Sequence, residues 1–383
     1  MSTFANSSPL PSLSPSTSSQ SSPPSSSSSV STIFDEKVVE NLRQSGYAVV
    51  DLSNVEGNAI LSQWETQFRT AFSQCTEVKM RSGEYRSDRG TGGLAVGYRR
   101  DDNREFFETR LTDDITSSVI PSLDDVPGHN ETVLALCRTL GLVGYHLLSA
   151  IAKHGLLVDH RCITELTDLP VVLHNELSQE VSSTVRAGEK AALHEYQGQS
   201  RLFPPLSSSV LRICSYPNVQ QSIHDDIAFG SHTDTSFLTI SPCSSVPGVE
   251  VYDWSRSVWL SPEMDRSSSC VIVFVGEMLE IITKRKFRAV VHRVRSPSFK
   301  QAEGETTSRV SAPYLIRGLH KAVFSPKNYN HPGGEEAVNE LADLDGVTCR
   351  EIHKILDFKR QRCAKSNENN PAEWVLSSFG VTL

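Results

Sequence analysis

The chain lacks an excess of basic residues. Its 383 residues carry 37 lysines and arginines against 45 aspartates and glutamates, which gives a formal charge of -8 at pH 7. Proteins that bind nucleic acid gather positive charge against the phosphate backbone, and this balance gives no such footprint. We therefore expect no nucleic-acid partner and favour a small molecule.

Paired cysteine motifs and long apolar runs are also missing. The eight cysteines include no Cys-x-x-Cys pair, so we expect reduced thiols rather than a disulfide framework. Apolar runs such as Val271 to Val275 are far shorter than the roughly 20 residues that span a bilayer. No charged-then-apolar signal peptide opens the sequence. These absences predict a cytoplasmic protein without a membrane anchor.

The first 32 residues contain few bulky apolar side chains and consist mainly of serine, threonine and proline. Such a segment cannot bury enough surface to offset the entropy of ordering, so we predict a disordered tail. Organelle transit peptides are also rich in serine and poor in acids, but they usually carry arginine. No lysine or arginine precedes Lys37, so a plain tail is favoured over a transit peptide.

The rest of the chain changes its hydrophobic pattern near residue 210. Residues 33–209 are predicted to form an N-terminal region that packs on the core, and residues 321–383 a C-terminal helical region. The predicted helices are Phe34–Leu42, Ala59–Thr76, Thr132–Ala152, Glu335–Leu341 and Glu351–Arg360, with one early strand at Gly46–Asp51.

Residues 210–320 contain short β-rich runs separated by turn residues. Several short strands at this spacing favour an antiparallel sandwich or barrel over alternating βα units. The predicted fold class is therefore mainly β with flanking helices, around a double-stranded β-helix (jelly-roll) core. The predicted core strands are Leu211–Tyr216, Ser236–Ile240, Val249–Trp254, Val271–Val275, Phe287–Val294 and Val310–Arg317.

Two histidines and an aspartate in this core could bind a metal. His232 and Asp234 are two residues apart, so in extended backbone they project to the same face. His292 lies in a later β-rich run that could reach them across the sandwich. Two imidazoles and one carboxylate are the ligand set of non-haem Fe(II) oxygenases. A His-x-Asp pair alone is weak evidence, because it arises by chance and is more often a surface hydrogen-bonded pair.

A second polar pair strengthens the argument. Arg309 and Ser311 are again two residues apart in a predicted strand, so both side chains lie on one face. An arginine can bind a carboxylate through two parallel hydrogen bonds, and a hydroxyl can add a third. By contrast, Glu277 and Glu280, which flank two apolar residues before a predicted strand, are interpreted as a turn residue and a structural acid.

From about Arg212 to Gly318 the chain resembles the 2-oxoglutarate/Fe(II)-dependent dioxygenases, in the branch similar to isopenicillin N synthase. The order and spacing of several short segments carry the resemblance. These segments are Leu211–Pro217, His232–Thr235, Gly276–Thr283, Val290–Val294 and Arg309–Tyr314, with looser matches at Gly46–Asp51, Gly97–Tyr98 and Glu105–Glu108.

The resemblance implies a role for each candidate residue. His232, Asp234 and His292 would bind Fe(II), and no further catalytic residue is expected. Arg309 and Ser311 would hold the distal carboxylate of 2-oxoglutarate, and Tyr216 would hydrogen-bond this co-substrate. The implied reaction consumes O2, releases succinate and CO2, and hydroxylates or desaturates a small organic molecule.

The sequence departs from the family at three places. Cys214 stands where many relatives have asparagine, and a thiol is a poor hydrogen-bond donor. The interval from His292 to Arg309 is 309 - 292 = 17 residues, longer than usual, which predicts an extra loop at 298–307. Residues 160–205 match no familiar segment and are a candidate substrate lid.

Two other functions stay open. An iron oxidase of the same fold could act without 2-oxoglutarate, since that branch shares the Arg-x-Ser pair. A non-catalytic metabolite-binding protein could also use the same jelly roll, although the intact ligand set disfavours it. No motif encodes the substrate or the oligomeric state.

Overall fold

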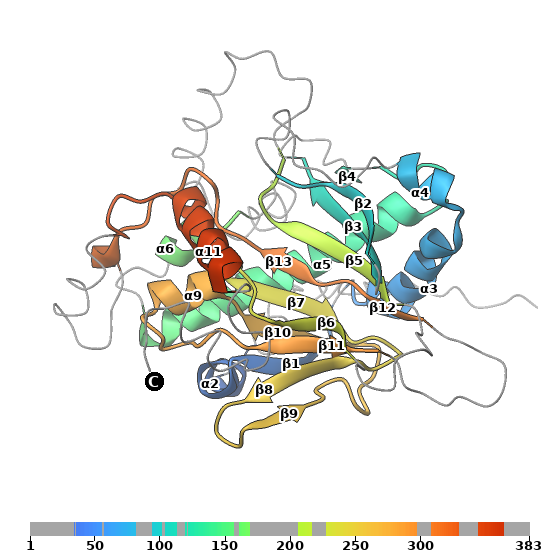
Figure 1. Cartoon of the computed structure of the whole chain (residues 1–383). Coiled ribbons are helices and arrows are strands. Elements are labelled where there is room, and N and C mark those ends of the chain that lie inside the picture. Colours follow the sequence, from blue (N-terminus) through green and yellow to red (C-terminus); the bar gives the residue numbers. More distant parts are fainter. Residues whose placement is uncertain are drawn as a thin grey trace, which may run out of the picture.

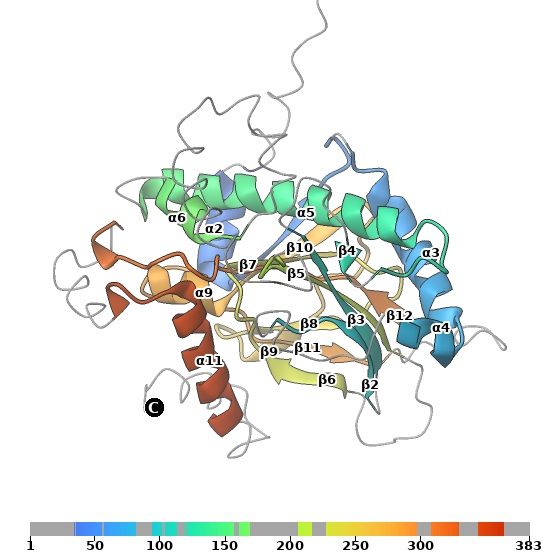
Figure 2. The ribbon, with the colours of Figure 1, turned by 90° about the horizontal axis from the view of Figure 1, so that it is seen from above.

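The computed structural model describes residues 34, 36–55, 57–81, 94–101, 104–112, 119–120, 122–156, 161–168, 206–216, 227–296, 308–328 and 344–363. Within these residues the strands form two antiparallel sheets that lie face to face, and the longest helix covers the outer side of the larger sheet (Figures 1 and 2). This is the layered arrangement of a jelly roll. The predicted fold class is confirmed.

The larger sheet has nine strands in the hydrogen-bonded order β1-β10-β7-β13-β5-β3-β2, with β12 beside β5 and β4 beside β3. Strands from the N-terminal part of the chain extend this sheet at both edges, because β1 pairs with β10 and β3 pairs with β5. The strands are β1 (Tyr47–Asp51), β2 (Gly97–Asp101), β3 (Arg104–Leu111), β4 (Val119–Ile120), β5 (Val210–Tyr216), β7 (Leu238–Pro242), β10 (Cys270–Val275), β12 (Arg309–Ser311) and β13 (Tyr314–Ile316).

The smaller sheet has four strands in the order β6-β11-β8-β9. Its central strand β11 pairs antiparallel with both β6 and β8. The strands are β6 (Ile227–His232), β8 (Val249–Asp253), β9 (Val258–Leu260) and β11 (His292–Arg295). In Figure 2 these strands lie on the side of the larger sheet opposite to the longest helix.

The helices cover the larger sheet and close one end of the molecule (Figure 1). The α-helices are α2 (Glu36–Ser45), α3 (Ile60–Ser73), α4 (Thr76–Arg81), α5 (His129–Ile151), α6 (Arg161–Leu166), α9 (Glu277–Ile282) and α11 (Cys349–Cys363). A π turn (Ala152–Leu156) continues α5, and a short 3-10 helix spans Pro326–Asn328.

The main core lies between α5 and the outer face of the larger sheet. Leu140 and Leu147 of α5 are fully buried in this core. Gly144 allows close contact, because a Cβ at this position would lie 1.9 Å from Cδ1 of Ile316 on β13. By length and composition the segment from His129 to His154 could cross a membrane, but half of its most apolar window is buried within the protein. That is the property of a core helix.

A second apolar cluster fills the space between the two sheets. Its members come from both sheets, so it marks the inner faces of the jelly roll. The buried members are Phe106, Cys214, Tyr216, Ala228, Cys243, Val249, Val251, Cys270, Ile272, Phe274, Val290 and Val294. We call this set the inner cluster.

Most predicted elements in the described residues are present, but β2, β3, β4 and β9 were not predicted, and the predicted strand Val310–Arg317 is divided into β12 and β13. Three further points also differ. Strand β6 was not predicted, because Gly230 and two polar neighbours interrupt its apolar alternation. Strand β11 begins only at His292, so the first half of the predicted run is not strand. The segment Glu277–Ile282 is a helix, where a turn was predicted. The predicted tail 1–32, the loop 298–307, the helix 335–341 and most of 160–205 lie outside the described residues.

Candidate metal and co-substrate site

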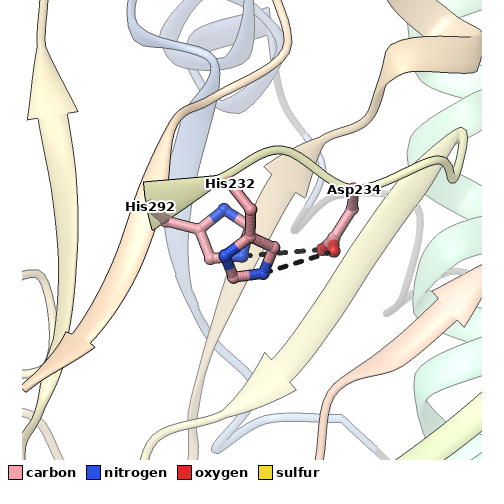
Figure 3. Close-up of side chains that lie close together, drawn as sticks. All are labelled: His232, Asp234 and His292. Carbon is pink, nitrogen blue, oxygen red and sulfur yellow. Dashed lines mark ion pairs between the residues drawn. The ribbon is translucent and has the colours of Figure 1, made fainter. Parts of the chain in front are cut away.

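His232, Asp234 and His292 lie together where β6 and β11 run side by side (Figure 3). His232 ends β6, His292 begins β11, and the two are direct partners in the antiparallel register. Asp234 follows β6, with Oδ1 3.9 Å from Nε2 of His232 and Oδ2 3.7 Å from Nε2 of His292. The predicted triad is therefore assembled. His292 comes from the neighbouring strand of the same sheet, not from across the sandwich as predicted.

Backbone carbonyls and aromatic rings orient both imidazoles. Nδ1 of His232 lies 2.9 Å from the carbonyl of Gly230, and Nδ1 of His292 lies 3.2 Å from the carbonyl of Val290. A carbonyl oxygen can only accept a hydrogen bond, so Nδ1 of each histidine must carry the proton that it donates. The lone pair on each Nε2 then faces Asp234. The ring of Phe274 stacks on His292 at 4.8 Å between centroids. Both Nε2 lone pairs are thus directed at the point where a metal would bind.

The carboxylate of Asp234 is kept ionised by its surroundings. Burial by itself raises the pKa of Asp234, but His292 and His232, when they are protonated in the absence of a metal, outweigh this effect. Thr239 adds to the lowering through a hydrogen bond from its Oγ1 to Oδ2 of Asp234 at 2.7 Å. The resulting pKa of Asp234 is about 2. The carboxylate therefore has the charge state that a metal ligand requires.

The start of α9 supports the backbone around Asp234. The amide of Glu277 donates to the carbonyl of Asp234 at 2.8 Å, and Oγ1 of Thr233 donates to the Glu277 carboxylate. Gly276 permits this contact, because a Cβ there would lie 2.1 Å from the carbonyl oxygen of Ser236. The Gly276–Thr283 segment thus stabilises the metal-binding turn.

Glu280 serves a different part of the fold. Its Oε2 accepts the backbone N–H of Ala289 at 2.8 Å, and burial raises the pKa of Glu280 to about 7. Glu277 and Glu280 therefore have separate partners, in agreement with the structural role predicted for them.

The triad fits a metal ion. One possible ligand atom from each of the three residues lies within 4.8 Å of those of the other two. The separations from Asp234 to the histidines exceed a normal hydrogen bond of about 3 Å. They are shorter than about 4.2 Å, the most that two metal–ligand bonds of about 2.1 Å can span. Two imidazoles and one carboxylate on one side of the ion match the non-haem Fe(II) ligand set.

The predicted co-substrate residues share one face of the larger sheet. Arg309 is the direct partner of Tyr216, and Ser311 is the direct partner of Cys214. Side chains two residues apart in a strand point to the same side, and Tyr216 and Cys214 belong to the inner cluster. The inner face of the sheet therefore carries all four side chains.

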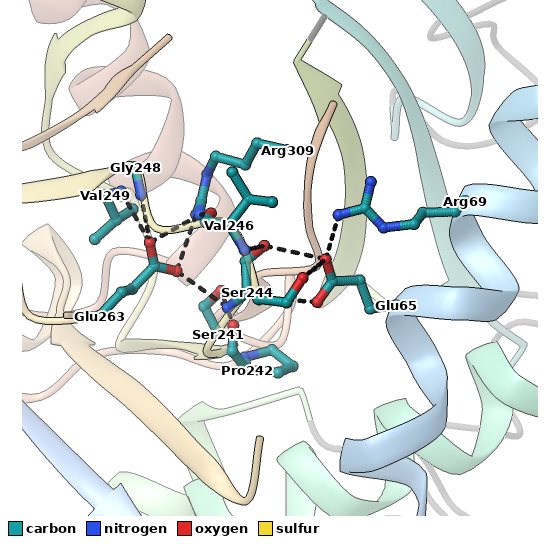
Figure 4. A network of polar contacts seen from close by, with 11 residues as sticks. Glu65, Arg69, Ser241, Pro242, Ser244, Val246, Gly248, Val249, Glu263 and Arg309 are labelled. Atoms are coloured by element: carbon teal, nitrogen blue, oxygen red, sulfur yellow. Dashed lines mark hydrogen bonds and ion pairs between the residues drawn. The ribbon is translucent and has the colours of Figure 1, made fainter. Parts of the chain in front are cut away.

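The Arg309 guanidinium already contacts a carboxylate that sequence analysis missed (Figure 4). Nη1 and Nη2 of Arg309 donate to the two oxygens of Glu263 at 2.8 and 3.0 Å, and Nη1 also donates to the carbonyl of Val246. Nε of Arg309 is buried and has no acceptor among the described residues. This leaves a donor that a bound anion could satisfy, so Arg309 fits its predicted role.

Two further arginines on the inner side were also missed. Arg212 of β5 binds Glu108 of β3, with Nε 2.8 Å from the carboxylate, and its charge helps to lower the pKa of Asp234. The guanidinium carbon of Arg104 lies 3.8 Å from the ring centroid of Phe229. Residues 104, 106 and 108 are two apart along β3, so their side chains lie on the same face of the strand. This spacing is the sequence signal that could have identified the inner face.

Comparisons with known proteins agree with this site. Residues 207–318 match the 2OG-Fe(II) oxygenase superfamily. The chain is 25% identical over 165 residues to gibberellin 2-beta-dioxygenase 3 of Arabidopsis thaliana, which covers 40% of this chain and 48% of that protein. It is 30% identical over 128 residues to gibberellin 3-beta-dioxygenase 3 of the same plant, which covers 32% and 34%. These matches span about half or less of the relatives' own length.

Structural similarity extends over more of the chain. The structure of dioxygenase for auxin oxidation 1 from Arabidopsis thaliana, in its binary complex with 2-oxoglutarate, superposes with a TM-score of 0.52 and 17% sequence identity. The superposition covers 76% of this chain and 90% of that one. At this identity the similarity concerns the fold, and it includes parts of the chain outside residues 207–318.

Proposed function

Because this chain belongs, through residues 207–318, to the 2OG-Fe(II) oxygenase superfamily, we propose that it is an Fe(II)/2-oxoglutarate-dependent dioxygenase that oxidises a small organic metabolite. The observation that carries the proposal is the convergence of His232, Asp234 and His292 on one point from two adjacent strands. An Fe(II) ion held by these three side chains would supply the chemistry that activates O2 with the co-substrate.

Each residue of the site has a separate task in this proposal. Bound Fe(II) supplies O2 activation coupled to the conversion of 2-oxoglutarate to succinate and CO2. His232, Asp234 and His292 hold the ion, and Thr239 keeps the aspartate oriented. Arg309, Ser311 and Tyr216 bind the co-substrate, whose distal carboxylate suits the N–H groups of Arg309 that have no acceptor among the described residues.

A spectroscopic titration tests the proposal. In the absence of O2, the Fe(II)-loaded protein should gain a weak visible charge-transfer band when 2-oxoglutarate is added. His232→Ala should lose this band, because one of three metal ligands is removed. His154→Ala is the matched control, since His154 is an exposed histidine on the π turn and should leave the band unchanged.

The same titration separates the alternatives. Iron binding without a band would favour a 2-oxoglutarate-independent oxidase, and a protein that binds no iron would overturn both catalytic proposals. For the substrate, release of succinate should be screened with small organic acids, terpenoids, flavonoids and amino-acid derivatives. The relatives named gibberellin dioxygenases make gibberellins the first compounds to try.

A further inference from the structure

One hydrogen-bonding edge of the Arg309 guanidinium has no acceptor among the residues that the structure describes. A guanidinium carries five N–H bonds in a rigid plane. Two N–H bonds of Nη1 are used by Glu263 and Val246, and one N–H bond of Nη2 is used by Glu263. The N–H of Nε and the second N–H of Nη2 have no acceptor among the described residues. These two N–H bonds are parallel and lie on the same edge of the planar guanidinium.

This open edge has the geometry of a carboxylate-binding site. Nε is buried without an acceptor among the residues that the structure describes, and a buried donor without an acceptor is destabilising. Two parallel N–H bonds match the two oxygens of a carboxylate. Glu263 occupies the end of the guanidinium, so its carboxylate and a second one can bind Arg309 at the same time.

Glu263 is itself fixed in place by the backbone. Its Oε2 accepts the amides of Gly248 at 2.8 Å and Val249 at 3.0 Å, and its Oε1 lies 3.3 Å from the amide of Ser244. The side chains of Glu263 and Arg309 are each only 1% exposed. A carboxylate held by three amides is a fixed support and not a mobile competitor for the guanidinium.

The turn that carries these amides is anchored on its other side. The amide and hydroxyl of Ser245 donate to Glu65 of α3 at 2.8 and 2.7 Å. Gly248 also lies against Arg309, because a Cβ there would be 2.7 Å from Cδ of the arginine. The position of the guanidinium is therefore determined by Glu263 and by the absence of a side chain at residue 248.

We propose that Glu263 is the positioning residue for co-substrate binding: it holds the end of Arg309 so that Nε and Nη2 face the distal carboxylate of 2-oxoglutarate. The inference rests on the proposed function. It assigns to Glu263 a task that no sequence pattern indicates, since Glu263 and Arg309 are 46 residues apart.

A pair of ligands tests this role. The compound 2-oxopentanoate has the length of 2-oxoglutarate but carries a methyl group in place of the distal carboxylate. Binding of each ligand to the full chain loaded with Mn(II) should be measured by calorimetry, together with the affinity for Mn(II). The wild-type protein should prefer 2-oxoglutarate. Glu263→Gln should weaken 2-oxoglutarate binding about tenfold, as loss of outer-shell support typically does, and change 2-oxopentanoate binding less than about twofold.

Two other variants control for a general loss of structure. Glu250→Gln removes another buried carboxylate, which pairs with Arg293 of the smaller sheet at 2.7 Å, and it should leave the ligand preference intact. Gly248→Ala keeps the charge of Glu263 but pushes on the Arg309 side chain, so it should reduce the preference as Glu263→Gln does. This second variant keeps the test decisive if Glu263→Gln does not fold.

The outcomes are distinct. A wild-type protein that binds Mn(II) but does not prefer 2-oxoglutarate contradicts the proposed function itself. A wild-type preference that survives in Glu263→Gln or Gly248→Ala overturns the positioning role alone. Tighter 2-oxoglutarate binding in Glu263→Gln also overturns it, because Glu263 would then compete with the co-substrate. Equal weakening of both ligands and of Mn(II) would show a purely structural role.

Discussion

The two ends of the candidate site are built in different ways. The metal end uses three residues from one turn and one adjacent strand, and its ligand atoms face one another at separations longer than hydrogen bonds. At the co-substrate end, all but one side of the Arg309 guanidinium is already bound to Glu263 and Val246. The metal end is therefore arranged to take up an ion between its own groups, whereas the other end presents one open edge of a fixed cation.

This difference predicts that the two binding events can be separated by mutation. Groups that support Asp234 should control metal affinity, and groups around Arg309 should control co-substrate affinity. If the metal end and the co-substrate end share no interacting residues, the changes in binding free energy caused by a mutation at each end should add. A variant that weakened metal binding and co-substrate binding equally would contradict this separation of the two ends.

Arg309→Ala should have the largest effect on co-substrate binding. Removing one partner of a buried charge pair costs about 2–5 kcal/mol, so 2-oxoglutarate should bind about a hundredfold more weakly, and the affinity for Mn(II) should stay within about twofold. Calorimetry with each ligand measures both values. An equal loss of metal and co-substrate would count against the assigned role of Arg309.

The loss of Arg309 also leaves Glu263 buried without its partner, which lowers stability. The double variant Arg309→Gln, Glu263→Gln replaces the charge pair with two neutral amides. We expect its melting temperature to recover toward that of the wild type while 2-oxoglutarate binding stays weak. Recovery of binding in the double variant would show that the positive charge on Arg309 is not required.

The pair His232 and Asp234 at the metal end was predictable because its signal is local, whereas the approach of His292 depends on the pairing of β6 with β11. The spacing of His232 and Asp234 places both ligands at the end of one extended run, and that run of sequence also enters a turn. Strands β5, β7 and β10 of the larger sheet were also predictable, because runs such as Val271–Val275 are continuous and apolar, whereas β2, β3 and β4 were not predicted. These features depend on neighbours in sequence.

The support of Arg309 could not be predicted in the same way. Glu263 follows a proline in a turn, where no periodicity indicates a face, and it reaches Arg309 only through the packing of a loop against β12. The nature of Glu277–Ile282 was misjudged for a similar reason. Its six residues are too few to show the periodicity by which a helix is recognised.

Thr239→Val should have an intermediate effect, confined to the metal end. The change removes the hydrogen bond from Oγ1 to Asp234 at 2.7 Å and keeps the side-chain shape. Loss of a partner that orients a metal ligand costs about tenfold in metal affinity. Mn(II) titration followed by the relaxation rate of water protons measures this change. The preference for 2-oxoglutarate over 2-oxopentanoate should be unaltered, and a change in that ratio would show that the two ends are coupled.

Ser311→Ala should have the smallest effect, and its partner in the register provides a matched control. Ser311 and Cys214 lie opposite each other on β12 and β5. The Ser311 hydroxyl can add one hydrogen bond to a carboxylate held by Arg309, which is worth about 1 kcal/mol, or roughly fivefold in 2-oxoglutarate affinity. A thiol is a weak donor, so Cys214→Ala should change the affinity less than about twofold. If Cys214→Ala weakened binding more than Ser311→Ala, the thiol would contact the co-substrate in place of the hydroxyl. The distal carboxylate of 2-oxoglutarate would then lie closer to β5 than to the Nε and Nη2 edge of Arg309.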